Sequence, residues 1–389
     1  MTSDVPNLRF PEFQGEWEKT KFGDIATGFD YGMNAAAKNY DGVNKYIRIT
    51  DIDEASSTYT DKDIVSPDGI LTDNYLVNNR DILLARTGAS TGKSYLYKQS
   101  DGKLYYAGFL IRANVTTHDP YFVFSQLHTH RYWRWVSIMS ARSGQPGINS
   151  QEYSSFPIYT TSIEEESKIA KLLSLLDERI ATQNKIIEDL KKLKSAIIEM
   201  EYGQMAKSIS HIGDFIEQIS KRNKDSAIKN VLSVSNSQGF IQQSEQFENR
   251  IVASDDTSNY KIVERNDFAF NPARINVGSI ARLTTFERGI VSPMYICFRT
   301  KDILFPEYLD YYFESKQFFT EIQKRLEGSV RQCLSFDGLC NIPLCVPAIE
   351  MQQQIGKRLS ALVQEIKLEI DFLELLQKQK KFLLYQMFI

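Results

Sequence analysis

Two segments in the first half of the chain combine hinge glycines with side chains that can hydrogen-bond to DNA. These polar residues are Arg86, Ser90 and Lys93 in RTGASTGKS, and Arg142, Gln145 and Asn149 in ARSGQPGINS. In the major groove, Arg or Lys recognises guanine, Asn or Gln recognises adenine, and Ser contacts either base. Lys93 and Arg142 are equally suited to phosphates, which position a protein on DNA without specifying its sequence. The composition therefore indicates DNA contacts; the alternative is that both segments are ordinary polar turns.

Two segments in the second half have a similar composition. They contribute Arg274 and Asn276 in NPARINVGS, and Ser329, Arg331 and Gln332 in EGSVRQCLSF. Each segment again combines a guanidinium or amide donor with a glycine that allows a tight turn. We predict that these five residues are the DNA-contacting candidates of the second half.

The sequence lacks the motifs of the catalytic classes that act on DNA or nucleotides. GASTGKS at 88–94 has three residues between its glycines, whereas a phosphate-binding loop needs four. DPYF at 119–122 and NPAR at 271–274 lack the second proline of the loop with which amino-methyltransferases grip a flipped base. The cysteines, histidines and carboxylates show neither zinc-ligand spacing nor a nuclease pattern. We therefore predict no catalytic site, no metal site and no cofactor bound by this chain.

The chain contains a long internal repeat. Residues 186 positions apart correspond, as in the pairs Asp81 and Asp267, Gly92 and Gly278, and Pro157 and Pro343. Near the start of each copy the shift is 190, because KFGDI at 21–25 matches HIGDF at 211–215. Solenoid repeats are only ~20–50 residues long, so this repeat indicates a duplicated domain.

Each copy places short strands before a long helix. Runs of β-branched and aromatic residues predict strands at YIRITDID, DILLART and FLIRANV in the first copy, and at KNVLSVS, DFAFNPA and MYICFRT in the second. Helical stretches are predicted around 121–140 and 306–326, and long helices begin near Ser162 and Ala348. We predict an α+β fold with two mixed α/β units joined by two long helices. The predicted parts are 1–160, 161–207, 208–347 and 348–389.

Both long helices carry a heptad repeat. The predicted seam includes Ile180, Gln183, Ile187, Leu190 and Lys194 in the first helix, and Ile366, Glu369, Leu373, Leu376 and Lys380 in the second. Spacings of three and four residues alternate, which is typical of a coiled-coil seam. The alternative is a pair of amphipathic helices lying on globular cores, which the strongly charged outer faces disfavour.

The polar seam positions predict that the two helices run antiparallel. A parallel arrangement would place Lys194 against Lys380, and like charges repel strongly where the dielectric constant is low. An antiparallel arrangement pairs Gln183 with Lys380 and Lys194 with Glu369 in a single register. That register predicts a pseudo-twofold axis near Ile187–Leu190.

Charge and composition limit the class of partner. The chain of 389 residues has 46 Lys and Arg against 49 Asp and Glu, a net charge of −3, which excludes a uniformly basic nucleic-acid coat. No apolar stretch approaches the ~20 residues of a membrane-spanning helix, and the first residues do not form a secretory signal. The four cysteines, all in the second half, favour reduced thiols. We expect a cytoplasmic protein without a membrane partner.

Over essentially its whole length the chain resembles the specificity subunit of type I restriction–modification enzymes. In the first copy the resemblance is carried by VPNLRFPEFQGEW, FGDI, RDILLARTGASTG and the SG…IN…FPIY stretch before SIEEESKIAKLLSLLDERI. In the second copy it is carried by IGDF, NDFAFNPARINVGS, GSVRQCLSFDGLCNIPLCVP and IEMQQQI. The resemblance implies that 1–160 and 208–347 are target recognition domains, each reading one half of a split DNA site. The helices would then be spacers that set the distance between the half-sites.

The resemblance also implies partners and a division of labour. Double-stranded DNA, two modification (methyltransferase) subunits and restriction/translocase subunits would be the partners. Those subunits would use S-adenosylmethionine, ATP and Mg for methylation, translocation and cleavage, and this chain would be non-catalytic. The two units differ heavily in sequence, so the readout by individual residues does not transfer from the family. The alternative function is a DNA-binding or coiled-coil scaffold protein without modification partners.

Overall fold

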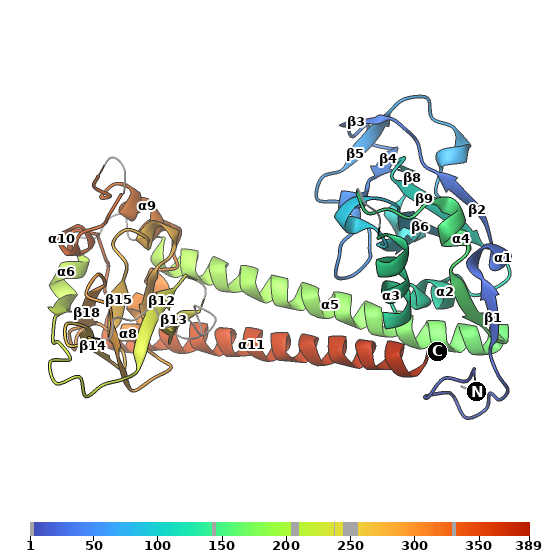
Figure 1. The fold of residues 1–389 in the computed structure, drawn as a ribbon. Helices are drawn as coiled ribbons and strands as arrows, with labels where there is room; N and C mark the ends of the chain where they lie inside the picture. The colour runs from blue at the N-terminus through green and yellow to red at the C-terminus, as the bar shows by residue number, and fades with distance from the viewer. Residues whose placement is uncertain (1–3, 142–144, 204–209, 237, 244–255, 329–331) are drawn as a thin grey trace. The chain divides into compact units, whose positions relative to one another are not determined.

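The computed structural model describes residues 4–141, 145–203, 210–236, 238–243, 256–328 and 332–389 (Figure 1). The chain forms two compact units, and each is described by itself. Unit 1 comprises Met1–Lys185 together with Ile370–Ile389, and unit 2 comprises Ile186–Glu369. Each unit therefore contains a globular part and a segment of both long helices. The sequence analysis instead separates the globular parts from the long helices, and those four boundaries stay a prediction.

Unit 1 is built around a four-stranded antiparallel sheet of order β2-β9-β6-β7. Its strands are β2 (Ala26–Tyr31), β9 (Leu110–Val115), β6 (Asp81–Ala85) and β7 (Ser94–Leu96). Three strand pairs accompany it: β1 (Glu18–Lys21) with β10 (Pro157–Thr160), β3 (Ala36–Asn39) with β5 (Val65–Asp68), and β4 (Lys45–Ile47) with β8 (Leu104–Tyr106). The short helices are α1 (Phe22–Ile25), α2 (Pro120–Gln126), α3 (His130–Met139) and α4 (Ser150–Ser154). Single 3₁₀ turns are η1 (Ile49–Asp51), η2 (Asp73–Tyr75), η3 (Gly88–Ser90) and η4 (Gln99–Asp101).

Unit 2 contains the equivalent sheet and a second one. The equivalent sheet has the order β11 (Ile216–Ile219), β18 (Ile296–Thr300), β15 (Phe268–Phe270) and β16 (Ile280–Arg282). The second sheet has the order β13 (Gly239–Gln242), β12 (Val231–Ser235), β17 (Arg288–Val291) and β14 (Lys261–Glu264), with β12 and β17 parallel. The short helices are α6 (Ile212–Phe215), α8 (Pro306–Tyr312), α9 (Lys316–Gln323) and α10 (Phe336–Cys340), and η6 is a 3₁₀ turn at Ile275–Val277.

Corresponding residues of the repeat make the same hydrogen bonds in the two units. The Asp81 carboxylate accepts from the Asn78 backbone at 2.7 Å, and Asp267 accepts from the Glu264 backbone at the same distance. Helices α2 and α8 begin 186 residues apart at equivalent prolines, a residue type suited to the first helical position. Together with the matching strand order, these bonds confirm the predicted mixed α/β fold of the duplicated units.

The helical stretch predicted around 121–140 is divided into two helices. The Thr129 hydroxyl donates to the Gln126 carbonyl at 2.8 Å and accepts from the Tyr132 backbone, so it ends one helix and caps the next. Ser315 makes the corresponding bonds between α8 and α9, donating to the Tyr312 carbonyl at 2.7 Å. Because these caps lie at equivalent positions, both units turn the chain at the same point.

The strand predicted over YIRITDID is also shorter than expected. Strand β4 ends at Ile47, and the chain turns through η1. The Asp51 carboxylate causes this turn, since it accepts from the Arg48 backbone at 2.8 Å and pairs with the Arg48 guanidinium at 2.7 Å. The local side-chain bonds outweigh the strand preference of the sequence.

Aromatic residues dominate the core of each unit. In unit 1 the fully buried rings include Phe22, Phe122 and Phe156, and Phe388, two residues after the C-terminal helix, packs against them. In unit 2 Phe268 stacks on Phe298 at 5.1 Å, and α8 and α9 pack against them. Each fully buried ring stabilises the fold by roughly 1.5–3 kcal/mol through its removal from water. Both long helices contribute to these cores, which anchors them to the globular parts.

The long helices are α5 (Ile163–Tyr202) and α11 (Ile349–Gln386) (Figure 1). In unit 1 they run antiparallel, because Leu173 lies beside Leu384 while Asp177, one turn later, pairs with Lys380 at 2.6 Å. Unit 2 likewise pairs the last turn of α5 with an early turn of α11, through an Arg358–Glu201 bond of 2.9 Å. The predicted antiparallel orientation of the helices is confirmed.

The seam positions face away from solvent, but the predicted register is wrong. Each of the ten predicted seam residues is buried or half-buried. Lys380 pairs with Asp177, six residues before the predicted Gln183, and Lys194 pairs with Glu314 at 2.6 Å instead of with Glu369. Both lysines place their ammonium groups on carboxylates that water can still reach, since Asp177 is 29% and Glu314 48% exposed. Because Lys194 and Lys380 pair with carboxylates outside the seam, neither lysine needs an acidic partner within it.

Candidate nucleic-acid interface

The two polar segments of unit 1 lie side by side. The Gly88 backbone donates to the Pro146 carbonyl at 3.0 Å, and the Ile148 backbone donates to the Arg86 carbonyl at 2.9 Å. Gly88 adopts a φ of 72°, a conformation that glycine reaches without strain. The described parts of two segments predicted separately from the sequence therefore lie against each other and form one surface.

That surface continues the ends of three neighbouring strands. Arg86 follows β6, Tyr31 ends β2, and Phe109 precedes β9. Antiparallel neighbours bring the end of one strand beside the start of the next, and the Arg86 backbone donates to the Phe109 carbonyl at 3.1 Å. The sheet thus gathers residues that lie 23 to 78 positions apart in the sequence.

The Arg86 guanidinium lies close to two aromatic rings. Its central carbon lies 4.8 Å from the centroid of the Tyr31 ring and 5.9 Å from that of Phe109, and its Nε donates to the Gly108 carbonyl at 3.1 Å. The two rings are 42% and 58% exposed, so the cluster opens to solvent. The Tyr31 hydroxyl accepts a hydrogen bond from the Ser150 backbone. Hydrogen bonding with Ser150 lowers the pKa of Tyr31, and the positive charge of Arg86 lowers it further. These contacts fix the plane of a positively charged hydrogen-bond donor at the surface.

The other predicted residues of unit 1 have different surroundings. Gln145 is exposed, and its amide lies beside Gly88, where an added Cβ would be 3.3 Å from Nε2. Lys93 pairs with the exposed carboxylate of Glu54 at 3.3 Å. Ser90 is half-buried at the end of η3. Arg142 lies outside the described residues.

Asn149 has a structural task that the sequence analysis did not recognise. Its side-chain oxygen accepts from the Glu152 backbone at 2.9 Å, while the Glu152 carboxylate accepts from the Asn149 backbone at 2.7 Å. This reciprocal arrangement is a capping box at the start of α4. Ser335 caps α10 at the equivalent position of unit 2, accepting from the Gly338 backbone at 3.0 Å.

Unit 2 brings its two polar segments together through the equivalent bond. The Leu334 backbone donates to the Pro272 carbonyl at 3.0 Å, and both residues lie 186 positions after Ile148 and Arg86. On this surface Arg274 and Gln332 are exposed and Asn276 is half-buried in η6. Ser329 and Arg331 lie outside the described residues.

The two surfaces share a backbone frame but differ in side chains. Pro272 replaces Arg86 at the equivalent position, and Tyr295, which replaces Phe109, is 9% exposed and packs into the core. The arginine beside two aromatic rings is therefore a feature of unit 1, because unit 2 has no arginine at the equivalent position.

Sequence reasoning missed Tyr31 and Phe109. Both are exposed aromatic residues immediately beside a strand end, and an aromatic residue in such a place is the signal that could have identified them. Their proximity to Arg86 depends on strand pairing, which residue types alone do not reveal.

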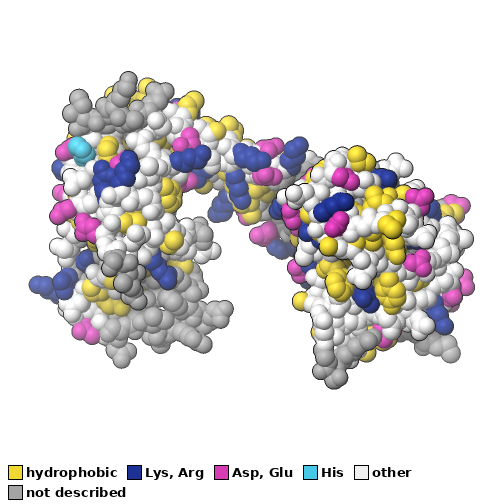
Figure 2. All heavy atoms as spheres, turned by 90° about the horizontal axis from the view of Figure 1, so that it is seen from above, with side chains coloured by type: hydrophobic (Ala, Val, Ile, Leu, Met, Phe, Trp, Pro, Cys, Tyr) yellow, Lys and Arg dark blue, Asp and Glu magenta, His cyan; other side chains and the backbone are white. Residues whose placement is uncertain are grey.

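The charge distribution agrees with the near-neutral composition. On the face shown in Figure 2, Lys and Arg are interspersed with Asp and Glu on each unit. Among the described residues there is no group of three or more side chains that could hold a metal ion. The part of the chain that the structure describes also has no helix long and apolar enough to cross a membrane.

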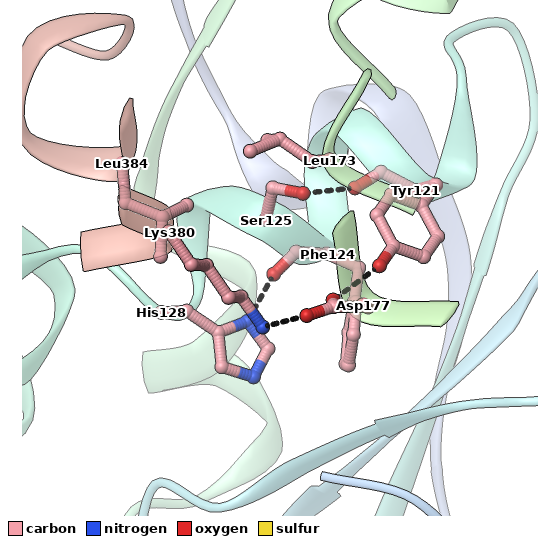
Figure 3. Close-up of a pocket in the computed structure, with 8 residues that line it drawn as sticks. All are labelled: Tyr121, Phe124, Ser125, His128, Leu173, Asp177, Lys380 and Leu384. Carbon is pink, nitrogen blue, oxygen red and sulfur yellow. Dashed lines mark hydrogen bonds and ion pairs between the residues drawn. The ribbon is translucent and has the colours of Figure 1, made fainter. Parts of the chain in front are cut away.

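A small pocket of unit 1 lies where the end of α11 meets α2 (Figure 3). The Asp177 carboxylate there accepts from the Tyr121 hydroxyl at 2.5 Å and pairs with Lys380 at 2.6 Å. The imidazole of His128 bonds to the Phe124 carbonyl at 2.9 Å and to the Ser57 hydroxyl at 3.0 Å. Burial lowers its pKa to about 4. These groups bind one another, so the pocket joins the C-terminal helix to the globular part.

Comparison with known proteins places both halves of the chain in one family. The model of the type I restriction modification DNA specificity domain matches residues 14–192 and 208–378. The chain is 23% identical to the MjaVIII type I restriction enzyme specificity subunit of Methanocaldococcus jannaschii, over 97% of this chain and 92% of that protein. Its fold is similar to a type-I restriction-modification system S subunit from M. genitalium, with a TM-score of 0.62, 14% identity and 99% of each chain covered. A chain from a structure of the type I R-M system has a TM-score of 0.54, 15% identity and coverage of 96% of this chain and 97% of that one. Because the family model covers most of both halves, the chain belongs to the type I restriction modification DNA specificity family.

Proposed function

We propose that this chain is the DNA-binding specificity subunit of a type I restriction–modification complex, and that each unit reads one half of a split DNA site. The observation that carries the proposal is the equivalent bond between polar segments in the two units, Ile148 to Arg86 and Leu334 to Pro272. One backbone frame thus presents two different sets of side chains. Such an arrangement suits a protein that recognises two unlike half-sites, because the side chains that contact bases specify the sequence.

The surface donors are the best candidates for base contacts. Arg86 is half-buried, whereas Gln145, Arg274 and Gln332 are exposed. We assign these four residues to base reading, because guanidinium and amide groups pair with guanine and adenine. Lys93 and Ser90, next to the same surface, suit phosphate contacts, and Asn276 lies beside Arg274. Arg142, Ser329 and Arg331 belong to the same polar segments and remain candidates.

The proposal includes the partners that the family implies. The chain itself is a specificity subunit and not a catalytic one. Two modification subunits would bind the long helices and use S-adenosylmethionine, and restriction/translocase subunits would use ATP and Mg. All would act on double-stranded DNA in the cytoplasm, and the paired helices would set the spacing between half-sites.

Mapping of methylated adenines tests the proposal directly. Cells that express the modification subunit together with this chain should methylate adenines at one split DNA motif. Cells that express the modification subunit alone should leave that motif unmethylated. Purified chain should also retain the modification subunit through gel filtration. Sequence-specific DNA binding without bound modification subunit or methylation would instead favour a DNA-binding protein that works alone. Absence of any motif, with both proteins folded, would overturn the proposal.

A further inference from the structure

We propose that Arg86 recognises a guanine in the half-site read by unit 1, and that Tyr31 and Phe109 are the residues that position it. The inference rests on the proposed function and deepens it, since it names one base and one reading residue. It is carried by the two rings whose centroids lie 4.8 and 5.9 Å from the central carbon of the guanidinium, at the end of the sheet.

The first step is the direction of the donors. Arg86 Nε is occupied by the Gly108 carbonyl at 3.1 Å, so the guanidinium is anchored on that edge. The terminal nitrogens form the remaining donor edge of the group, and two parallel donors match the O6 and N7 acceptors of guanine. The neighbouring rings at 4.8 and 5.9 Å restrict rotation of the plane.

The second step is that the cluster is supported from several elements. Tyr31 is itself held by Ser150, whose backbone donates to its hydroxyl at 3.3 Å at the start of α4. The Arg86 backbone is bonded on both sides, to Phe109 and to Ile148. A donor fixed in this way before binding loses little conformational freedom when it meets a base.

The third step is the difference between the units. Phosphates are chemically the same in both half-sites, whereas the bases differ, so a sequence-reading residue need not recur in the repeat. Pro272 stands at the position equivalent to Arg86 and has neither a side-chain donor nor a backbone N–H. The predicted guanine contact therefore belongs to one half-site.

The experiment uses the complete complex of this chain with its modification subunit. Arg86→Lys and Arg86→Ala are compared with wild type by methylation mapping and by competition among DNA duplexes substituted at each position. Lys98→Ala is the matched control for the loss of one positive charge. Lys98 is exposed and follows β7, whose pairing with the start of β6 places it at the opposite end of the sheet.

Arg86→Ala should accept other bases at a single G·C position in one half-site, with the second half-site unchanged. Arg86→Lys should do so less strongly, because lysine can still donate to guanine. Binding to the wild-type site should weaken by about 10–100-fold, the usual discrimination of a bidentate contact. Tyr31→Leu and Phe109→Leu should weaken discrimination at the same position by less. Lys98→Ala should retain the wild-type motif. Unchanged thermal melting would show that each variant is folded.

Other outcomes would overturn the inference. Equal weakening on every sequence with an unchanged motif would make Arg86 a phosphate contact. Relaxation at an A·T position, or no change in the motif, would also contradict it. Failure of wild-type complex to methylate any split motif would instead refute the proposed function, so the two failures are distinguishable.

Discussion

At the scale of single residues, the repeat preserves structural tasks more faithfully than candidate DNA contacts. Thr129 and Ser315 both cap the second of two short helices, and Asp81 and Asp267 both accept a backbone bond three residues upstream. Arg86 and its equivalent proline, by contrast, share only a backbone position. Residues that hold the backbone in place are thus the same or similar in the two units, whereas residues on the candidate DNA surface differ.

Asn149 is expected to act on stability through its helix cap. Asn149→Ala should lower the free energy of unfolding by about 1 kcal/mol, because the Glu152 backbone loses its acceptor. Asn149→Ser is the matched control, since serine caps as well as asparagine. Chemical denaturation measures both. If Asn149 also reads a base, Asn149→Ser will alter the methylation motif while stability is kept.

His128 is expected to make the stability of unit 1 depend on pH. Burial lowers the pKa of its imidazole from about 6.5 to about 4; the nearby Lys380 charge lowers it as well, and Asp177 opposes this. The unfolded imidazole takes up its proton below pH ~6.5 while the folded one stays neutral to about pH 4. The free energy of unfolding should therefore fall as pH drops through this window, by up to about 3 kcal/mol. His128→Gln should reduce this loss in denaturant titrations at pH 7 and pH 5; an identical loss would contradict the assignment.

At the scale of elements, the lysines at seam positions of the long helices form ion pairs with carboxylates outside the seam. Lys380 meets Asp177, and Lys194 meets Glu314 of the globular part of unit 2, and both partners remain accessible to water. A lysine can thus occupy a seam position without a buried counter-charge. The register then follows from packing and surface pairs together.

The Asp177–Lys380 pair should contribute measurably to docking of the C-terminal helix. The partners are 22% and 29% exposed and Asp177 also binds Tyr121, so Lys380→Ala should cost on the order of 1 kcal/mol. Lys378→Ala is the matched control, because its pair with Glu374 is 3.8 Å long and more than half exposed. Urea unfolding of the two variants should separate them. Equal effects would mean that the pocket pair adds nothing beyond a surface ion pair.

At the scale of the whole molecule, two separate cores explain why one half could change without the other. Each unit has its own aromatic core, its own sheet and its own segments of α5 and α11. Substitutions on the surface of one unit should therefore leave the core of the other unit intact.

Exchange of one unit's globular part tests this independence. Replacing residues 208–347 by the equivalent part of a related specificity subunit should change one half of the methylated motif and preserve the other. Methylation mapping with the same modification subunit reads out both halves at once. A chimera in which both halves change, while it still binds the modification subunit, would show that the units do not read independently.

The sequence by itself determined the features that depend on local periodicity. The 186-residue repeat, the helix starts near Ser162 and Ala348 and the seam positions are visible because apolar spacing and turn residues are local properties. The composition of RTGASTGKS and ARSGQPGINS identified each segment separately as a candidate, and only the structure shows the bonds that bring them together.

The tertiary structure alone decided which distant residues meet. Tyr31, Arg86 and Phe109 come together because β2, β9 and β6 pair in one antiparallel register, and residue types do not encode that pairing. The capping role of Asn149 and the ion pairs of Lys194 and Lys380 likewise depend on which partner lies within a few ångströms. Hydrogen bonds and ion pairs act over such short distances that only the packed fold selects among the available partners.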